Sequence, residues 1–148
     1  MHIDFHSSDR STLGVEWEVA LVERATGELA PRADEVLEAV TAEHPELGEE
    51  GDHPRVTGEF LQNTVEMVTG ISETVGEAVT DLASTQDLIR EVTDPRSLEI
   101  FGAGTHPFSD WTQQPVVDKE RYYKVLDRAQ YWGCLLYTSD AADDSLRV

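Results

Sequence analysis

The sequence predicts an α+β fold built on an antiparallel sheet. Residues 12–22 and 60–68 alternate apolar and polar side chains, which indicates strands with one buried and one open face. Segments with helical spacing of apolar residues separate the strands. This order also permits a parallel doubly wound sheet. Strands covered by helices on both faces are continuously apolar, however, so the polar alternate positions favour an antiparallel sheet that lines a cleft.

The first predicted strand runs from Thr12 to Val22 and has two distinct faces. An apolar set lies on one face and a polar or small set on the other: Leu13, Val15, Trp17, Val19 and Leu21 against Gly14, Glu16, Glu18 and Ala20. Arg24 to Gly27 have the composition of a turn. Residues 12–29 are therefore predicted to form a hairpin or a tight reversal ending at Leu29.

A short helix and a second strand are predicted next. Asp34 is expected to cap a helix that ends at His44-Pro45, and residues 46–54 are expected to be a loop. A strand is then predicted over Phe60 to Val68. Its alternating residues again form an apolar and a polar set: Leu61, Val65 and Met67 against Gln62, Thr64, Glu66 and Val68.

The third helix and strand pair follows a clear start signal. Thr74 and Glu77 fit a capping box, and the helix is predicted to continue to Thr93, with Pro95 just beyond. Its buried face is predicted from helical spacing: Val75, Val79, Leu82, Gln86 and Ile89. A strand over residues 98–103 runs into a glycine-containing loop. A last helix is expected to start at Asp118, with Tyr122 and Tyr123 in its core.

Composition and charge exclude several classes of function. The 148-residue chain has 30 acidic and 11 basic side chains and a formal net charge of -19. Its field repels nucleic-acid backbones and anionic lipid surfaces, so neither is an expected partner. Small anions such as nucleotides can still bind if divalent cations lie between the like charges. The single cysteine, Cys134, excludes an internal disulfide or a thiolate cluster, which leaves oxygen and nitrogen ligands.

The sequence predicts neither a transmembrane helix nor a signal peptide at its start. No apolar run reaches transmembrane length, and Met1 to Asp4 lack the pattern of a signal peptide, so we expect a cytoplasmic protein. Residues 134–148 lack periodicity and resemble the conceptual translation of a transposase adapter used in sequencing libraries. We interpret this segment as a non-native tail and exclude it from the fold prediction; a natural polar tail is the alternative.

Three glutamates on polar strand faces are candidate metal ligands. Glu16 and Glu18 project from the same face of the first strand, about 7 Å apart. Mg²⁺ with nucleotide phosphates can join such carboxylates. Glu66, with Gln62 expected on the same face, would add a third carboxylate if the two strands are neighbours. The alternative is a solvated outer face, since glutamate on exposed strand positions is common.

The loop Gly102 to Phe108 contains two further candidates. It is neither a Walker loop nor a dinucleotide-binding fingerprint. Thr105 and His106 offer a hydroxyl and an imidazole at a strand end, where sites commonly form, although His106 taken alone favours the interpretation of a structural loop histidine. No Ser-His-Asp or Cys-His arrangement is apparent, so no catalytic residue is assigned.

These motifs together resemble a known family. The motifs, in order, are Leu13-Gly-Val-Glu-Trp-Glu18, Thr64-Val-Glu-Met-Val-Thr69, Leu98-Glu-Ile-Phe-Gly-Ala-Gly-Thr-His-Pro-Phe108 and Glu120-Arg-Tyr122. In this order and spacing they are similar to the bacterial type 2 glutamate–cysteine ligases, also called carboxylate-amine ligases. The resemblance covers residues 11–133.

The resemblance implies a glutamine-synthetase-like catalytic domain, with an antiparallel sheet lining the active site and helices outside. It implies ATP and Mg²⁺ as cofactors, and glutamate with cysteine or another amine as substrates. In the implied reaction ATP phosphorylates the γ-carboxylate of glutamate and the amine displaces phosphate, a step in glutathione-type thiol biosynthesis. By matching position, Glu16, Glu18 and Glu66 would hold metal, and Gln62, Thr105 and His106 would lie near substrate or nucleotide.

The sequence contains only part of what the family's sequences contain. The family continues into a strand with a His-x-His motif and later carboxylate and arginine strands, which this chain does not contain. Residues 1–133 are therefore interpreted as the N-terminal part of the catalytic domain. Two alternatives stay open: a non-catalytic fragment or binding module, and an ATP-dependent ligase with another acceptor. The sequence predicts neither the acceptor nor the oligomeric state.

Overall fold

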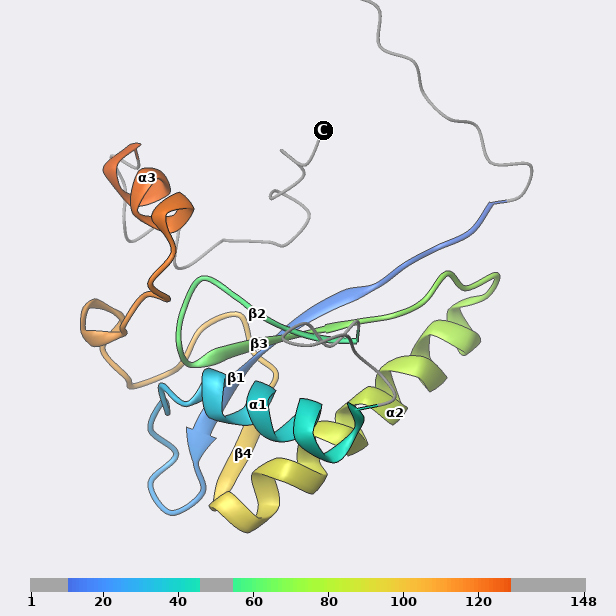
Figure 1. Ribbon diagram of the computed structural model, residues 1–148, viewed down its shortest axis with the longest axis horizontal. Coiled ribbons are helices and arrows are strands. Elements are labelled where there is room, and N and C mark those ends of the chain that lie inside the picture. The colour runs from blue at the N-terminus through green and yellow to red at the C-terminus, as the bar shows by residue number, and fades with distance from the viewer. Residues whose placement is uncertain (1–10, 46–54, 129–148) are drawn as a thin grey trace, which may run out of the picture.

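The computed structural model describes residues 11–45 and 55–128, which form a four-stranded antiparallel sheet with helices (Figure 1). The main elements follow this order: β1 Glu16–Glu23, α1 Ala33–Glu43, β2 Val56–Gly58, β3 Thr64–Val68, α2 Val75–Thr93, β4 Leu98–Phe101 and α3 Glu120–Arg128. Two single-turn 3₁₀ segments lie between them, η2 Asp94–Arg96 and η3 Trp111–Gln113. The strand order is β2-β3-β1-β4, with every pair antiparallel. The predicted α+β class and antiparallel sheet are confirmed.

One face of the sheet forms the core with α1 and α2, which lie on the same side of it (Figure 1). Val19 lies opposite Val65 on the neighbouring strand, and Trp17 lies opposite Met67. Both helices add small and branched apolar side chains to this face. The core comprises Val19, Leu21, Ala30, Ala33, Val36, Ala39, Val40, Val56, Val65, Met67, Ile89, Val92 and Leu98. Of the alternating apolar set predicted for β1, Val19 and Leu21 thus face the helices, whereas Trp17 is 39% exposed. The glutamates of β1 lie on the opposite face.

The predicted reversal after β1 is confirmed. The Gly27 N–H donates to the Glu23 carbonyl at 2.7 Å, and the chain returns to pair Val22 with Leu29. Gly27 has φ +71°, a left-handed conformation that glycine adopts without a steric penalty. A Cβ there would also meet the Phe108 ring at 3.4 Å. The turn therefore lies in close contact with the loop that follows β4.

Helix α2 begins as predicted but buries a different face. The capping box is present: Thr74 Oγ1 accepts from the Glu77 N–H, and the Glu77 carboxylate accepts from the Thr74 N–H. The predicted face is wrong at the start of the helix, because Val75 and Val79 are 70% and 58% exposed. The buried positions are Ala78, Thr85, Ile89, Val92 and Thr93. Small Ala78 and Thr85, whose hydroxyl donates to the Asp81 carbonyl, allow the helix to lie close to the sheet.

Five predicted boundaries differ from the structure. β1 begins at Glu16 and not at Thr12, and β4 ends at Phe101 and not at residue 103. Asp34 does not cap α1; Arg32 is the N-cap residue and makes no side-chain capping bond, so Asp34 lies in the first turn. The strand expected from Phe60 begins only at Thr64, because the preceding residues pair with residues 115–117 instead of joining β1. Helix α3 begins at Glu120, two residues after Asp118. Tyr122 is buried against Phe60, but Tyr123 is 46% exposed.

A three-residue strand was not predicted from the sequence. β2, Val56–Gly58, pairs only with β3 and forms one edge of the sheet. Its length is too short for alternation to indicate a strand. Residues 46–54, expected to be a loop, and the interpreted tail 134–148 lie outside the described residues.

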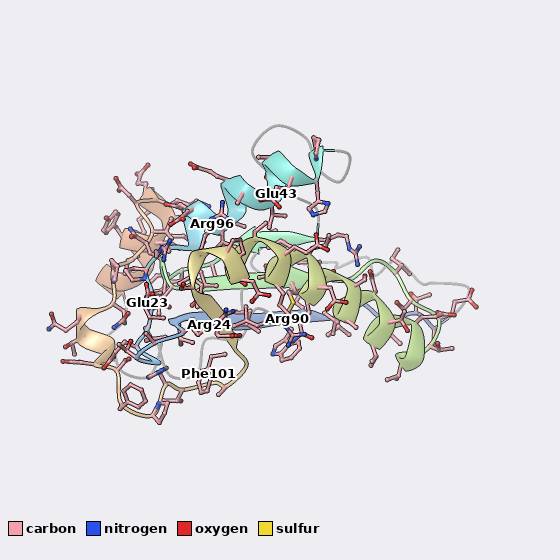
Figure 2. The ribbon with its side chains drawn as sticks, turned by 90° about the horizontal axis from the view of Figure 1, so that it is seen from below. Glu23, Arg24, Glu43, Arg90, Arg96 and Phe101 are labelled. Atoms are coloured by element: carbon pink, nitrogen blue, oxygen red, sulfur yellow. The ribbon has the colours of Figure 1, made fainter. Side chains whose placement is uncertain are left out.

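Ion pairs join the helices to one end of the sheet, where Glu23, Arg24 and Arg96 gather (Figure 2). Arg24 Nε donates to Glu99 at 2.8 Å and its Nη2 pairs with Asp94. At the start of α1, the bonds that Arg32 donates to Glu35 hold the pKa of that carboxyl below its ordinary value.

Within the described ranges, no helix has the length and apolarity needed to span a membrane.

Candidate carboxylate site on the polar sheet face

Three polar side chains form a row across the sheet face that points away from α1 and α2. Glu18 on β1 lies directly opposite Glu66 on β3. Glu66 in turn lies directly opposite Thr57 on β2. Because opposed residues of antiparallel strands share a face, Thr57, Glu66 and Glu18 project side by side from three neighbouring strands. We refer to these three residues as the carboxylate row.

Glu66 is the buried member of the carboxylate row. Its exposed fraction is 9%, and its Oε2 accepts a hydrogen bond from Thr57 Oγ1 at 2.8 Å. Directly opposed residues have Cβ atoms about 4.5–5.5 Å apart, and like charges in that relationship repel. A divalent cation between Glu18 and Glu66 would turn this repulsion into attraction, since carboxylate oxygens are preferred ligands of hard cations.

Glu16 shares the face but lies outside the row. It pairs in register with Val68, two residues along β1 from Glu18, and is exposed. The predicted same-face placement of Glu16 and Glu18 and the neighbouring position of Glu66 therefore both occur. Among the described residues, however, no group of three or more His, Cys, Asp or Glu side chains is close enough to hold a metal ion. The donor set is a carboxylate pair, which suits Mg²⁺ because that ion keeps waters and substrate phosphates as its other ligands.

Gln62 does not lie with the glutamates. It occupies the turn before β3 instead of the strand. Its Nε2 donates to the Val116 carbonyl at 3.1 Å, and its backbone N–H donates to the Pro115 carbonyl at 3.0 Å. The described contacts of Gln62 thus attach residues 115–116 to the sheet.

His106 attaches the loop after β4 to the β1 hairpin turn. The Ser109 N–H donates to His106 Nδ1 at 3.0 Å, so that nitrogen is an acceptor and carries no proton. The proton is then on Nε2, which donates to the Gly27 carbonyl at 2.8 Å. The ring also packs against Phe101 and Phe108. The structural interpretation of His106 matches these contacts, whereas Thr105 next to it is exposed.

Sequence reasoning missed Thr57. The residue lies in the short Val-Thr-Gly strand, and its hydroxyl meets Glu66 only because β2 pairs with β3. The one available signal was its neighbourhood: an isolated Val-Thr pair just before the longer alternating segment.

The chain thus forms an α+β scaffold that places two opposed carboxylates on the sheet face away from its helices. The chain belongs to the family described as glutamate-cysteine ligase family 2 (GCS2), whose profile matches residues 12–139. The match ends inside the segment that begins at Cys134. The resemblance inferred from the sequence motifs is therefore confirmed at the level of the family.

Bacterial relatives carry the corresponding names. Proteins named "Putative glutamate–cysteine ligase", with the suffixes 2-1, 2-2 and 2, come from Arthrobacter sp. FB24, Paenarthrobacter aurescens TC1 and Corynebacterium glutamicum R. They are 59%, 56% and 49% identical to this chain over 133 residues, which is 90% of it. The aligned part is only 35%, 35% and 34% of the relatives, so the chain spans about a third of their length.

Proposed function

We propose that the protein to which this chain belongs is an ATP-dependent carboxylate-amine ligase that joins the γ-carboxylate of glutamate to the amine of cysteine. The membership of GCS2 and the names of the relatives support this reaction. The single structural observation that carries the proposal is the Glu18–Glu66 pair on the sheet face away from the helices. A face of this kind would line the active site of the glutamine-synthetase-like domain that the sequence motifs imply.

The proposed reaction has two steps. An oxygen of the γ-carboxylate attacks the terminal phosphorus of ATP, which releases ADP and forms an acyl phosphate. The amine nitrogen then attacks the acyl carbon, the bond from that carbon to the phosphate oxygen breaks, and phosphate leaves. Little covalent chemistry is required of the protein, so positioning and charge stabilisation are its main contributions.

The residues of this chain would contribute cation ligands. Bound Mg²⁺ would neutralise phosphate charge and orient the transferring group. Glu18 and Glu66 would hold it from two neighbouring strands, and Glu16 would act further along β1, through a water or on a second cation. Their carboxylates are placed by a sheet that is anchored on its other face by the apolar core. Preorganised ligands of this kind need not reorganise during the reaction.

The loop residues are proposed to act by shaping the edge of the site. His106 would hold the loop after β4 in place, since both its ring nitrogens are engaged. Thr105 would be the residue of this loop that contacts substrate or nucleotide. Gln62 would contribute through the segment it attaches, residues 115–116, rather than through its own side chain amide.

The extent of the chain favours a second proposal for the isolated polypeptide. Because it covers about a third of the relatives, the 148 residues by themselves would be a non-catalytic fragment. Residues 1–133 would be the N-terminal part of the ligase domain, and residues 134–148 would not belong to it. Amplifying and sequencing the source locus across the Gly133 codon tests this boundary. A reading frame that continues into a His-x-His strand supports it, and a stop codon after Val148 contradicts it.

ADP release by the complete ligase tests the proposed reaction. We expect ADP to form in the presence of Mg²⁺, glutamate and cysteine, and to fall to background when either the amine or Mg²⁺ is omitted. Replacing cysteine by other amino acids in the same assay identifies the acceptor. ADP release with another amine but not with cysteine would favour a different acceptor. No ADP release with any amino-acid pair would reject the ligase assignment.

A further inference from the structure

The hydrogen bond between Thr57 and Glu66 gives the carboxylate row a defined geometry. Thr57 Oγ1 donates to Glu66 Oε2 at 2.8 Å across neighbouring strands. Among the residues that the structure describes, the Glu66 side chain makes no other hydrogen bond. One carboxylate oxygen is therefore held from the β2 side, while Oε1 keeps its coordinating capacity on the face it shares with Glu18.

We propose that Thr57 is a positioning residue that orients the Glu66 carboxylate for cation binding. This inference rests on the proposed function, because it assigns a role within the same site. The hydroxyl does not contact the cation; it fixes the plane of the carboxylate that does. Partners of metal-binding carboxylates commonly act in this way, and their removal costs roughly 10- to 100-fold in metal affinity.

Threonine suits this role because of its stiffness and its location. Its branched Cβ restricts rotation about χ1, so the hydroxyl direction is set by the backbone of β2. β2 is fixed to β3 by the register that places Thr57 opposite Glu66, and its neighbour Val56 is in the core, 1% exposed. The hydroxyl is thus held by the same packing that holds the sheet.

A purely structural hydrogen bond is the competing explanation. A neutral hydroxyl bonded to a carboxylate stabilises the folded chain whether or not a metal binds nearby. Under that explanation Thr57→Val would lower the melting temperature and leave metal affinity unchanged. If Thr57 positions Glu66, the metal affinity of Thr57→Val falls by a larger factor than its change in folding stability can explain. Thr57→Ser, which keeps the hydroxyl, restores that affinity.

Thr64 supplies a matched control on the same sheet face. It lies on β3 opposite Ala20, and its hydroxyl donates to Asn63 Oδ1 at 3.0 Å instead of to a glutamate. Thr64→Val therefore removes a bonded hydroxyl two residues from Glu66 without touching the carboxylate row. Both variants replace a threonine hydroxyl by a methyl group. They differ in the hydrogen bond that is lost, which goes to Asn63 in one and to Glu66 in the other.

The experiment measures Mn²⁺ binding to the complete ligase by electron paramagnetic resonance, with circular dichroism melts of each variant. Wild type, Thr64→Val and Thr57→Ser are expected to bind with dissociation constants within about threefold of one another. Thr57→Val is expected to bind at least tenfold more weakly. The Glu66 side-chain ¹³Cδ resonance of metal-free protein should shift in Thr57→Val and stay near the wild-type position in Thr57→Ser.

The outcomes separate this inference from the proposed function. Wild-type affinity in a folded Thr57→Val variant, or failure of Thr57→Ser to restore binding, would overturn the positioning role alone. Equal weakening by Thr64→Val would overturn it too, since the effect would not depend on Glu66. An absence of Mn²⁺ binding to folded wild type would reject the cation site on the carboxylate pair, and the role of Thr57 with it.

Discussion

Glu18 and Glu66 lie directly opposite each other on neighbouring antiparallel strands, with their side chains on the sheet face that points away from the helices. Like charges directly opposite each other on neighbouring strands are destabilising. A third strand contributes Thr57, which donates a hydrogen bond to Glu66. This arrangement links the fold of the chain to the cation-dependent chemistry proposed for its family.

Neutralising Glu66 should abolish the stabilisation of the chain by Mg²⁺. Glu66→Gln keeps the side-chain shape and an acceptor for Thr57, but removes the charge that the cation needs. At ten times the dissociation constant, Mg²⁺ should stabilise wild type by about 1.4 kcal/mol, measured as a higher melting temperature than in chelator. The variant should melt at the same temperature in both buffers.

Glu38 provides the control for the loss of one negative charge. It is exposed on α1, on the opposite side of the sheet. Glu38→Gln should keep the full Mg²⁺ shift, and Glu16→Gln should keep part of it because Glu16 lies outside the carboxylate row. An undiminished Mg²⁺ shift in Glu66→Gln would show that the ion binds elsewhere.

Adding a methyl group at Gly102 should destabilise the fold, whereas the same change at Gly104 should not. A Cβ at Gly102 would lie 2.7 Å from Cζ2 of Trp17, while one at Gly104 meets nothing within 4 Å. The indole packs closely over the chain where it leaves β4, so Gly102→Ala forces a shift that costs about 1–3 kcal/mol. Urea unfolding measures both variants. Equal stabilities would mean that Trp17 moves aside without cost.

Removing the His106 ring should loosen the loop that follows β4. In His106→Ala the Ser109 N–H loses its acceptor, so its hydrogen exchange should accelerate about fivefold, as expected for about 1 kcal/mol. Thr105→Ala removes an exposed side chain from the same loop and should leave the exchange of Ser109 unchanged. In wild type at neutral pH, ¹⁵N spectra should show the His106 proton on Nε2; a proton on Nδ1 would contradict the observed bonding.

Glu35 should contribute stability that disappears in acid. Bonds from Arg32 lower the pKa of Glu35 below its ordinary value of 4.5. The unfolded chain therefore takes up this proton at a higher pH than the folded chain, so the contribution is complete above about pH 4.5 and is lost as the pH falls through the folded pKa.

Melting temperatures of Glu35→Gln and wild type measure this contribution. The variant should melt a few degrees lower at pH 7, and the difference should shrink as the pH falls below 4.5. A difference that stays constant down to pH 2 would mean that Glu35 acts by packing and not by its charge.

Much of the fold was predictable because its signals are local. Alternation gave the two faces of β1, and the Thr74–Glu77 capping box gave the start of α2. The site was predictable in part: Glu16 and Glu18 follow from period-two geometry, and Glu66 was placed near them only on the condition that the strands are neighbours. That condition is met through the register of β1 with β3.

The remaining features depend on contacts between distant segments. Gln62 has strand-like neighbours, but residues 115–117 compete for its backbone and draw it into a turn. Val75 and Val79 have helical spacing, yet the sheet contacts the face with Ala78 and Thr85. Thr57 lies in an element too short to be periodic, and Gly27, whose carbonyl bonds His106, lies far from it in sequence. Local patterns carry no information about such pairings.

The most direct test is the Mg²⁺ dependence of ADP release by the complete ligase, measured for wild type and Glu66→Gln with glutamate and cysteine. We predict that wild type releases ADP only when Mg²⁺ is present, and that the variant retains less than about 1% of this rate at saturating substrates, which corresponds to about 2.7 kcal/mol in the barrier. A variant that releases ADP at the wild-type rate, with the same Mg²⁺ requirement, would contradict the assignment of the carboxylate pair as the cation site.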